Sequence, residues 1–284
     1  MRVALTGASG FLGWHTRARL KALTDCDVVA LSRAEWHRLP EVVGKVDAVI
    51  HVAGVNRGAA DVVREGNVGL AKDLATAIEH SASAPTVIYA NTIQAGNGTP
   101  YGCGKAEAGA ILRKAAVSSG SGFSDVLLPN LFGEHGRPDY NSFVATFVDG
   151  IVRGSQLQIE DRDVELLHVQ DAAQALITAL SCTGAEQVRP RGTKTSVLEV
   201  YQTLMSLYGV YRHGEVPSLA TKFEADLLNT LRVPAFDSGG AIPLERKTDD
   251  RGSLVEVVRA HGGEGQTFLS TTKPGITRGQ HFHL

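Results

Sequence analysis

Short apolar runs alternate with longer amphipathic stretches through the first half of the chain. The short runs predict buried strands, because strands covered on both faces read as near-continuous apolar segments. They lie at 3–6, 28–31, 47–52, 86–90 and 125–128. The longer stretches repeat their apolar residues with a helical period and predict helices at 13–23, 67–80, 105–117 and 142–152. Strands that alternate with helices indicate an α/β fold with a doubly wound parallel sheet.

The alternation loosens beyond about residue 155. Helices are predicted at 171–180, 196–208 and 220–231, with Asp171 expected to cap the first of them. From residue 236 the sequence becomes β-prone, and strands are predicted at 253–258 and 266–271 between glycine-rich turns. We therefore predict two domains, 1–235 and 236–284, with substrate bound mainly by the part of the first domain after residue 130.

Composition and charge narrow the classes of function. The 284 residues are 43% hydrophobic with a formal net charge of −2, which gives no basic surface for nucleic acid or an anionic membrane. No apolar run reaches the roughly 18–20 residues of a membrane span. The first apolar run is shorter than the core of a secretory signal, so we predict a cytoplasmic enzyme. The three cysteines are far apart in the sequence and predict neither a disulfide framework nor a cysteine zinc site.

A glycine-rich turn follows the first predicted strand. Its glycines stand at positions 7, 10 and 13. The first permits a tight turn, the second lets the backbone approach a pyrophosphate, and the third lets the helix pack on the sheet. Backbone amides at the helix N-terminus then face the phosphates, as in Rossmann-type dinucleotide sites. The predicted cofactor contacts here are Gly7, Ser9, Gly10, Phe11, Leu12 and Gly13.

The end of the second strand predicts which dinucleotide binds. Enzymes that use NAD usually carry an acid there, which accepts hydrogen bonds from the ribose hydroxyls. This chain has Ser32 and Arg33, which suit a 2′-phosphate, so NADP(H) is the expected cofactor. His51, Ala53 and Gly54 follow the third strand and are expected to line the adenine and ribose side, with His51 in a structural role.

A tyrosine and a lysine four residues apart begin a predicted helix. Tyr101 and Lys105 then share one helix face, where the ammonium would lower the pKa of the phenol and also hold the nicotinamide ribose. Thr92 ends the preceding strand and supplies a hydroxyl for the substrate oxygen that Tyr101 protonates. The Y-x-x-x-K pair alone is a weak signal, and its weight comes from the turn and Thr92 upstream.

The order of these features resembles the extended short-chain dehydrogenase/reductase family over roughly residues 1–235. The resemblance implies that Thr92, Tyr101 and Lys105 are catalytic and that Asn67 supports them. It also implies a homodimer formed through the helices at 67–80 and 105–117, with Ile111 buried between subunits.

A closer resemblance is carried by the segments 51–57, 92–95, 129–133 and 140–147. They resemble bifunctional capsular-polysaccharide enzymes that form UDP-2-acetamido-2,6-dideoxy-L-talose on the way to UDP-N-acetyl-L-fucosamine. The resemblance implies reduction of the C4 keto group of a UDP-linked 2-acetamido-2,6-dideoxy-hexulose with NADPH, for capsular or surface polysaccharide precursors. It implies these substrate contacts: Asn130, Phe132, Tyr140, Asn141 and Ser142.

In that subgroup a C-terminal cupin domain binds zinc and epimerises C3. Segments 249–253 and 273–283 resemble the start of this domain, so 236–284 is predicted to be a truncated, β-rich cupin fragment. His281 and His283 form only the first half of the cupin metal motif. Two ligands are too few for zinc, and no tight metal site is predicted.

Three other functions stay open. A nucleotide-sugar C4-epimerase would use the same catalytic groups with a bound NAD, although it usually carries an acid where Ser32 and Arg33 stand. A 4,6-dehydratase needs an acid and a base beside the catalytic threonine, where this chain has Ile93 and Gln94. A dinucleotide-binding regulatory protein could share the fold but need not keep the threonine, tyrosine and lysine.

Overall fold

The computed structural model describes residues 1–239, 244–262 and 265–277. The chain forms two compact units, each built from two segments. The first unit comprises Met1–Gly133 and Val164–Lys194, and the second comprises Glu134–Asp163 and Thr195–Leu284.

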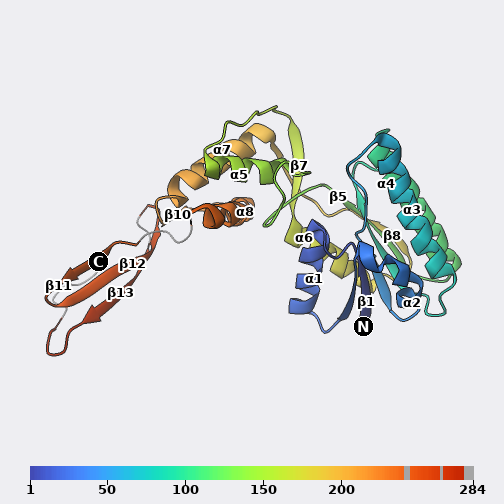
Figure 1. The fold of residues 1–284 in the computed structure, drawn as a ribbon, viewed down its shortest axis with the longest axis horizontal. Coiled ribbons are helices and arrows are strands. Elements are labelled where there is room, and N and C mark those ends of the chain that lie inside the picture. The colour runs from blue at the N-terminus through green and yellow to red at the C-terminus, as the bar shows by residue number, and fades with distance from the viewer. Residues whose placement is uncertain (240–243, 263–264, 278–284) are drawn as a thin grey trace. The chain divides into compact units, whose positions relative to one another are not determined.

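The first unit is built on a six-stranded sheet in the order β2-β1-β3-β4-β5-β8, in which every neighbouring pair is parallel (Figure 1). Every residue of β3 is buried, as is every residue of β1 except the first, which fits a sheet covered on both faces. The predicted α/β fold class is thereby confirmed. The strands are β1 (Arg2–Thr6), β2 (Asp27–Leu31), β3 (Ala48–His51), β4 (Thr86–Thr92), β5 (Phe123–Leu128) and β8 (Ala185–Val188).

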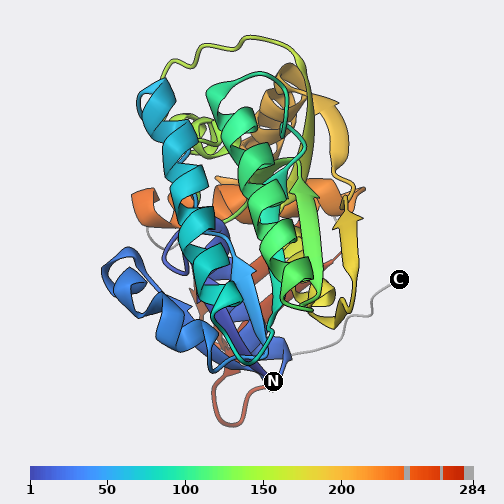
Figure 2. The ribbon, with the colours of Figure 1, turned by 90° about the vertical axis from the view of Figure 1, so that its right-hand side faces the viewer.

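Helices cover both faces of this sheet, because successive strand residues point to opposite sides. On one face Ile50 packs with α1 (Phe11–Leu23) and α6 (Val169–Thr178). On the other face Val49 packs with α2 (Leu39–Val43), α3 (Ala60–Glu79) and α4 (Pro100–Ser118). Figure 2 shows α3 and α4 side by side across this second face. The strand order reverses at β1 and β3, and ligands of such sheets bind beyond the carboxyl ends of the strands at that point.

Shorter elements connect this framework, and the sequence pattern did not predict them. A 3-10 helix, η1 (Arg33–Arg38), follows β2, and another, η2 (Ala179–Ser181), follows α6. A three-stranded sheet has the order β6-β7-β9, with β6 (Asn130–Phe132), β7 (Asp163–His168) and β9 (Thr193–Ser196). Because β7 continues to His168, α6 begins at Val169 with His168 at its cap. The expected capping role of Asp171 is therefore wrong, and Asp171 lies in the first helical turn.

The second unit contains three helices among its described residues: α5 (Phe143–Arg153), α7 (Val197–Tyr211) and α8 (Lys222–Gly239). Ser142 caps α5 by accepting a hydrogen bond from the backbone amide of Ala145 at 3.4 Å. Ser196 caps α7 through a reciprocal arrangement with Glu199. The predicted domain boundary near residue 235 falls within α8 and stays a prediction.

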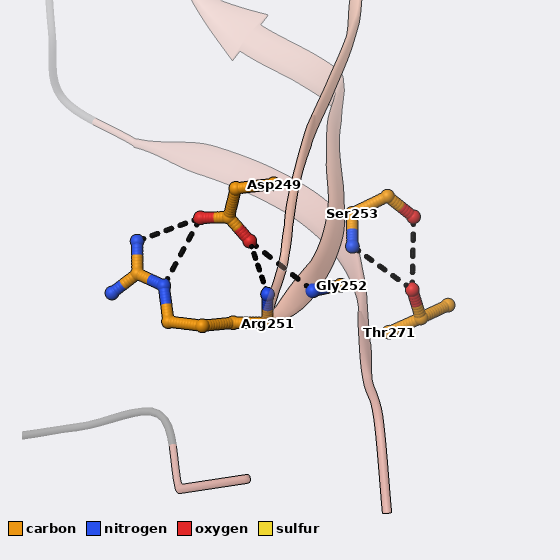
Figure 3. A network of polar contacts seen from close by, with 5 residues as sticks. All are labelled: Asp249, Arg251, Gly252, Ser253 and Thr271. Atoms are coloured by element: carbon orange, nitrogen blue, oxygen red, sulfur yellow. Dashed lines mark hydrogen bonds and ion pairs between the residues drawn. The ribbon is translucent and has the colours of Figure 1, made fainter.

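The C-terminal sheet of this unit consists of β10 (Glu215–Val216), β11 (Arg246–Asp249), β12 (Gly252–Ala260) and β13 (Gln266–Thr272). Asp249 closes the turn between β11 and β12 by accepting backbone hydrogen bonds from Arg251 at 2.9 Å and Gly252 at 3.1 Å (Figure 3). Ser253 and Thr271 join β12 to β13 through their hydroxyls at 2.8 Å. Polar side chains thus close the turn between β11 and β12 and link β12 to β13.

Candidate active site

The glycine-rich turn after β1 depends on glycine at two positions. Gly7 has φ of +68°, and a Cβ there would lie 2.7 Å from the backbone nitrogen of Ala53. A Cβ on Gly13 would overlap the carbonyl oxygen of Gly7, so α1 could not pack this closely on the turn. Gly7 also donates its amide hydrogen to Leu31 at 3.1 Å, which joins the turn to the end of β2.

The first turn of α1 fits an anion. Gly10 caps the helix without a side-chain hydrogen bond, and the first turn contains no acidic residue. Ser9 and Gly10 are exposed, while Leu12 and Gly13 are buried. An exposed helix N-terminus with uncapped amides is the arrangement that holds a pyrophosphate. The cofactor roles predicted for this turn stay predictions that its geometry fits.

An acidic side chain stands where the sequence predicts a 2′-phosphate. Glu35 accepts hydrogen bonds from the Ser32 backbone amide at 3.2 Å and from the Ser32 hydroxyl at 2.9 Å. These bonds lower the pKa of Glu35 and keep it ionised. Arg33 opens η1 with an exposed side chain. Glu35 is not among the predicted site residues, although a serine three residues before a glutamate is a recognisable capping box.

The turn after β3 is held by two buried polar side chains. His51 makes a 2.8 Å hydrogen bond through Nδ1 with the hydroxyl of Thr6 and stacks on Tyr89 at a ring distance of 5.7 Å. Burial, assisted by the charge of Lys105, lowers the pKa of His51 to about 3. The imidazole is therefore neutral at physiological pH, which suits the structural role expected for it. The same Thr6 hydroxyl accepts a hydrogen bond from the backbone amide of Ala53 at 3.3 Å.

Asn67 of α3 binds the loop that follows this turn. Its Nδ2 donates to the carbonyl oxygens of Val55 at 2.6 Å and Val63 at 2.7 Å, and its Oδ1 accepts from the amide of Val55 at 3.2 Å. A Cβ on Gly54 would lie 3.0 Å from the same Oδ1. The side chain is 3% exposed. Its support of the site would therefore act through the position of this loop.

Thr92 ends β4 with its hydroxyl beside the loop that leads to α4. The hydroxyl oxygen accepts a hydrogen bond from the backbone amide of Gln94 at 3.2 Å. The backbone amide of Thr92 donates to Oδ1 of Asn91 at 2.9 Å. A hydroxyl that accepts from the protein keeps its own hydrogen to donate elsewhere, which is what a substrate carbonyl oxygen requires.

Lys105 lies in the first turns of α4 with its side chain buried. Its Nζ donates to the carbonyl oxygen of Ala90 at 2.6 Å and lies 4.1 Å from the centroid of the Tyr89 ring. Burial lowers the pKa of Lys105 to about 7, and the charge of Asp125 opposes this lowering. The lysine can therefore change its protonation state near neutral pH.

Tyr101 lies in the first turn of α4, which Thr99 caps by accepting from the amide of Gly102 at 3.0 Å. Burial raises the pKa of Tyr101. The expectation that Lys105 lowers the pKa of this phenol is therefore not met, because the ammonium binds the Ala90 carbonyl and the Tyr89 ring instead. Tyr101 is held in its protonated form, which is the form that donates a proton.

The predicted substrate contacts fall in both units. In the first unit Asn130 is exposed and donates weakly to the carbonyl of Glu165 at 3.4 Å, whereas Phe132 is only 1% exposed and packs edge-on against His168. In the second unit Tyr140 is 39% exposed, Asn141 is exposed, and Ser142 is half-buried at the cap of α5. All five roles stay predictions.

The C-terminal histidines of the cupin motif, His281 and His283, lie outside the described residues. Among the residues that the structure describes, no group of three or more His, Cys, Asp or Glu side chains is placed to hold a metal ion. The same part of the chain contains no helix with the length and apolar character needed to cross a membrane.

A doubly wound sheet with a bare helix N-terminus after β1 and a tyrosine–lysine pair at the head of α4 defines a dinucleotide-binding enzyme class. Residues 3–188 match the NAD dependent epimerase/dehydratase family, and residues 247–284 match the polysaccharide biosynthesis C-terminal domain. The chain belongs to the NAD dependent epimerase/dehydratase family, the extended short-chain dehydrogenases/reductases that modify nucleotide sugars with NAD(P).

Individual relatives agree with this family and with the closer resemblance. The whole chain is 30% identical over 291 residues to UDP-2-acetamido-2,6-beta-L-arabino-hexul-4-ose reductase of Pseudomonas aeruginosa and covers 78% of it. It matches the structure of capsular polysaccharide assembling protein CapF from Staphylococcus aureus with a TM-score of 0.78, at 29% identity, covering all of this chain and 78% of that one. UDP-N-acetylglucosamine 4-epimerase from Bacillus cereus has the same fold, with a TM-score of 0.66 at 18% identity, over 86% of this chain and 99% of that one.

Proposed function

We propose that this protein reduces the C4 keto group of a UDP-linked 2-acetamido-2,6-dideoxy-hexulose with NADPH, in the synthesis of capsular or surface polysaccharide precursors. The observation that carries the proposal is the likeness of the whole of this chain to 78% of a UDP-4-keto-hexulose reductase, in a chain that has the threonine, tyrosine and lysine of the family. We assign reduction to residues 1–235, and the match of residues 247–284 to a polysaccharide biosynthesis domain supports a separate role for the C-terminal part.

The residues present suit the addition of a hydride and a proton to a carbonyl group. When bound, a reduced nicotinamide supplies the hydride. Tyr101 donates the proton to the oxygen of the former keto group, and the Thr92 hydroxyl donates a hydrogen bond to the same oxygen. In this mechanism the Lys105 ammonium holds the nicotinamide ribose, which is the other role expected for it.

The protonation state of Tyr101 is compatible with reduction, as it is for a tyrosine of ordinary pKa. Burial raises the pKa of its phenol, so the residue carries its proton at neutral pH. A reductase needs a proton donor at this position, whereas oxidation of an alcohol needs a base. Mixing the protein with NADPH and the UDP-4-keto-sugar and following the absorbance of the reduced nicotinamide tests the proposal directly. No NADPH consumption with this substrate would count against it.

A C4-epimerase with bound NAD is the second candidate, because Glu35 places a carboxylate at the end of β2. An acid there favours the ribose hydroxyls of NAD over a 2′-phosphate. The two candidates differ in stoichiometry. A reductase consumes one reduced cofactor per sugar, whereas an epimerase interconverts sugars with no net consumption and should carry NAD when purified.

Two substitutions at the end of β2 separate the cofactors. Arg33→Ala should weaken NADPH binding by about 1–3 kcal/mol, the scale of a lost hydrogen bond to a charged group, and leave NADH binding nearly unchanged. Glu35→Gln should strengthen NADPH binding, because it removes a negative charge near the 2′-phosphate. Titration calorimetry with each cofactor measures both effects. Equal changes for NADPH and NADH in either variant would contradict the NADP assignment.

We also propose a homodimer in which α3 and α4 of two copies form a four-helix interface. Val62 of α3 and Val117 of α4 are 52% and 56% exposed and would supply apolar surface to this interface. Ile111 is partly buried in the subunit's own core and offers only its remaining surface. Light scattering should give twice the chain mass at micromolar concentration, and Val117→Glu should shift it toward the monomer. A monomeric parent protein would overturn this proposal.

A further inference from the structure

Asp125 lies one strand away from the candidate catalytic residues and is linked to them by side-chain hydrogen bonds. It stands on β5 opposite Tyr89 of β4. Its Oδ1 accepts from Nδ2 of Asn91 at 2.9 Å, and its Oδ2 accepts from Nε2 of Gln187 at 3.2 Å. Oδ1 of Asn91 in turn accepts the backbone amide of Thr92. A continuous chain of hydrogen bonds therefore runs from the Asp125 carboxylate to the residue with the predicted catalytic hydroxyl.

The donors and acceptors in this series of hydrogen bonds have a fixed order. The carboxylate of Asp125 can only accept, so the amide nitrogen of Asn91 must face it and the amide oxygen must face the Thr92 backbone. Helix α4 packs closely on the same side chains: a Cβ on Gly109 would lie 3.2 Å from Nδ2 of Asn91. Asn91 is 5% exposed and has little freedom to turn. Removing the negative charge would let this amide reverse.

The same face of the sheet holds the Lys105 ammonium. Lys105 is 5% exposed, and a buried ammonium is unstable unless a negative charge lies near it. The carbonyl oxygen of Ala90 and the ring of Tyr89, which contact Nζ, supply only partial charges. Asp125 supplies a full negative charge that favours the protonated lysine.

We propose that Asp125 is a positioning residue of this site: its carboxylate orients Asn91 and Thr92 and serves as the counter-charge that favours the protonated form of Lys105. The proposal rests on the proposed function only in taking Thr92 and Lys105 as catalytic. It assigns no contact between Asp125 and the substrate or cofactor.

The other titratable groups around Lys105 are neutral or paired. On β3, burial lowers the pKa of His51 to about 3. On β4 and α4, burial raises the pKa of the Tyr89 and Tyr101 phenols, so both keep their protons. At the contact between α3 and α4, Arg64 and Glu107 form an exposed ion pair at 3.0 Å, in which the two charges offset each other.

The test measures the protonation of Lys105 in the protein without cofactor, so that it does not depend on activity. Lysine labelled with ¹³C at Cε reports its protonation by NMR, and Lys105→Met assigns the resonance. The wild-type midpoint is expected near pH 7. In Asp125→Asn, which has nearly the same shape, the midpoint should fall by about one pH unit, the scale of a lost neighbouring charge. The alkaline limb of the pH profile of kcat should move to lower pH by the same amount.

Three further variants separate charge from orientation. Asp125→Glu keeps the charge and should keep the midpoint near that of the wild type. Asn91→Ala breaks the path to Thr92 but leaves Asp125 charged, so kcat should fall about tenfold while the midpoint does not fall. Glu186→Gln is the matched control. The carboxylate of Glu186 accepts a hydrogen bond at 3.1 Å from Ser124, which precedes Asp125 and points to the opposite face of β5. The Lys105 midpoint should not move in this variant.

The outcomes distinguish this proposal from the proposed function. An unchanged Lys105 midpoint in Asp125→Asn overturns the counter-charge, and an unchanged kcat in Asn91→Ala overturns the orientation of Thr92. A midpoint that falls in Asp125→Asn while the kcat profile stays in place supports the coupling between Asp125 and Lys105. That last result would count against a catalytic role of Lys105, but not against the proposal for Asp125.

Discussion

Tyr101→Phe should lower kcat for keto-sugar reduction by about 10²–10⁴-fold, the range for a lost general acid. The substitution removes only the phenol oxygen, and no hydrogen bond to that oxygen within the protein is needed to hold the head of α4, which Thr99 caps. The affinity for NADPH should therefore stay close to that of the wild type. Stopped-flow absorbance of the reduced nicotinamide measures kcat, and fluorescence titration measures cofactor binding.

Tyr89→Phe is the matched control for this experiment. Tyr89 also has a phenol on the same face of the sheet, but its hydroxyl donates to the backbone oxygen of Lys105 at 3.5 Å. Loss of that long hydrogen bond should change kcat far less than Tyr101→Phe does. A Tyr101→Phe enzyme with the wild-type rate would remove Tyr101 from the mechanism, whatever the control shows.

Lys105→Met should lower kcat about 100-fold or more, the scale of removing one preorganised electrostatic group, while the fold is retained. Methionine fills a similar volume and needs no counter-charge, and Asp125 keeps the hydrogen bonds that it accepts from Asn91 and Gln187. The opposing loss is the hydrogen bond to the Ala90 carbonyl. Steady-state rates and thermal unfolding of the same preparation measure the two properties separately.

The pH dependence of stability gives a second readout for Lys105. Its pKa is about 7 in the folded protein and 10.5 in an ordinary lysine, so between these values the unfolded chain binds a proton that the native state does not. The contribution of this group to the free energy of unfolding therefore rises with pH across that window, by up to about 1.4 kcal/mol per pH unit. Below it both states are protonated and the burial penalty is complete. This rise should be absent in Lys105→Met, and an unchanged slope would show that the native fold does not lower the pKa of Lys105.

Much of the framework follows from local sequence. The glycines at 7, 10 and 13 predict the turn after β1, and the structure explains two of them by close backbone approach. The apolar runs predict every strand of the six-stranded sheet except β8, whose four residues are largely exposed. Helix α3 begins at Ala60, seven residues before the predicted start, because its first turns carry no regular apolar repeat.

Local sequence also contained one signal that changes the cofactor question. Ser32 and Glu35 are three residues apart, so the two hydrogen bonds that Glu35 accepts from Ser32 need no tertiary contact. The order of turn, threonine, tyrosine and lysine was enough to identify the family that the comparisons confirm. These features are legible because each depends on residues within a few positions of one another.

The electrostatics of the site were decided by the tertiary structure. Asn91 and Asp125 are 34 residues apart, and only the parallel register of β4 and β5 brings their side chains together. Tyr101 and Lys105 share a helix face as their spacing predicts, yet the pKa of the phenol is raised, because burial is a property of the packed core. Spacing along a helix determines which residues can meet. How far each is desolvated, and which distant charge lies beside it, depends on the strands and helices that close over it.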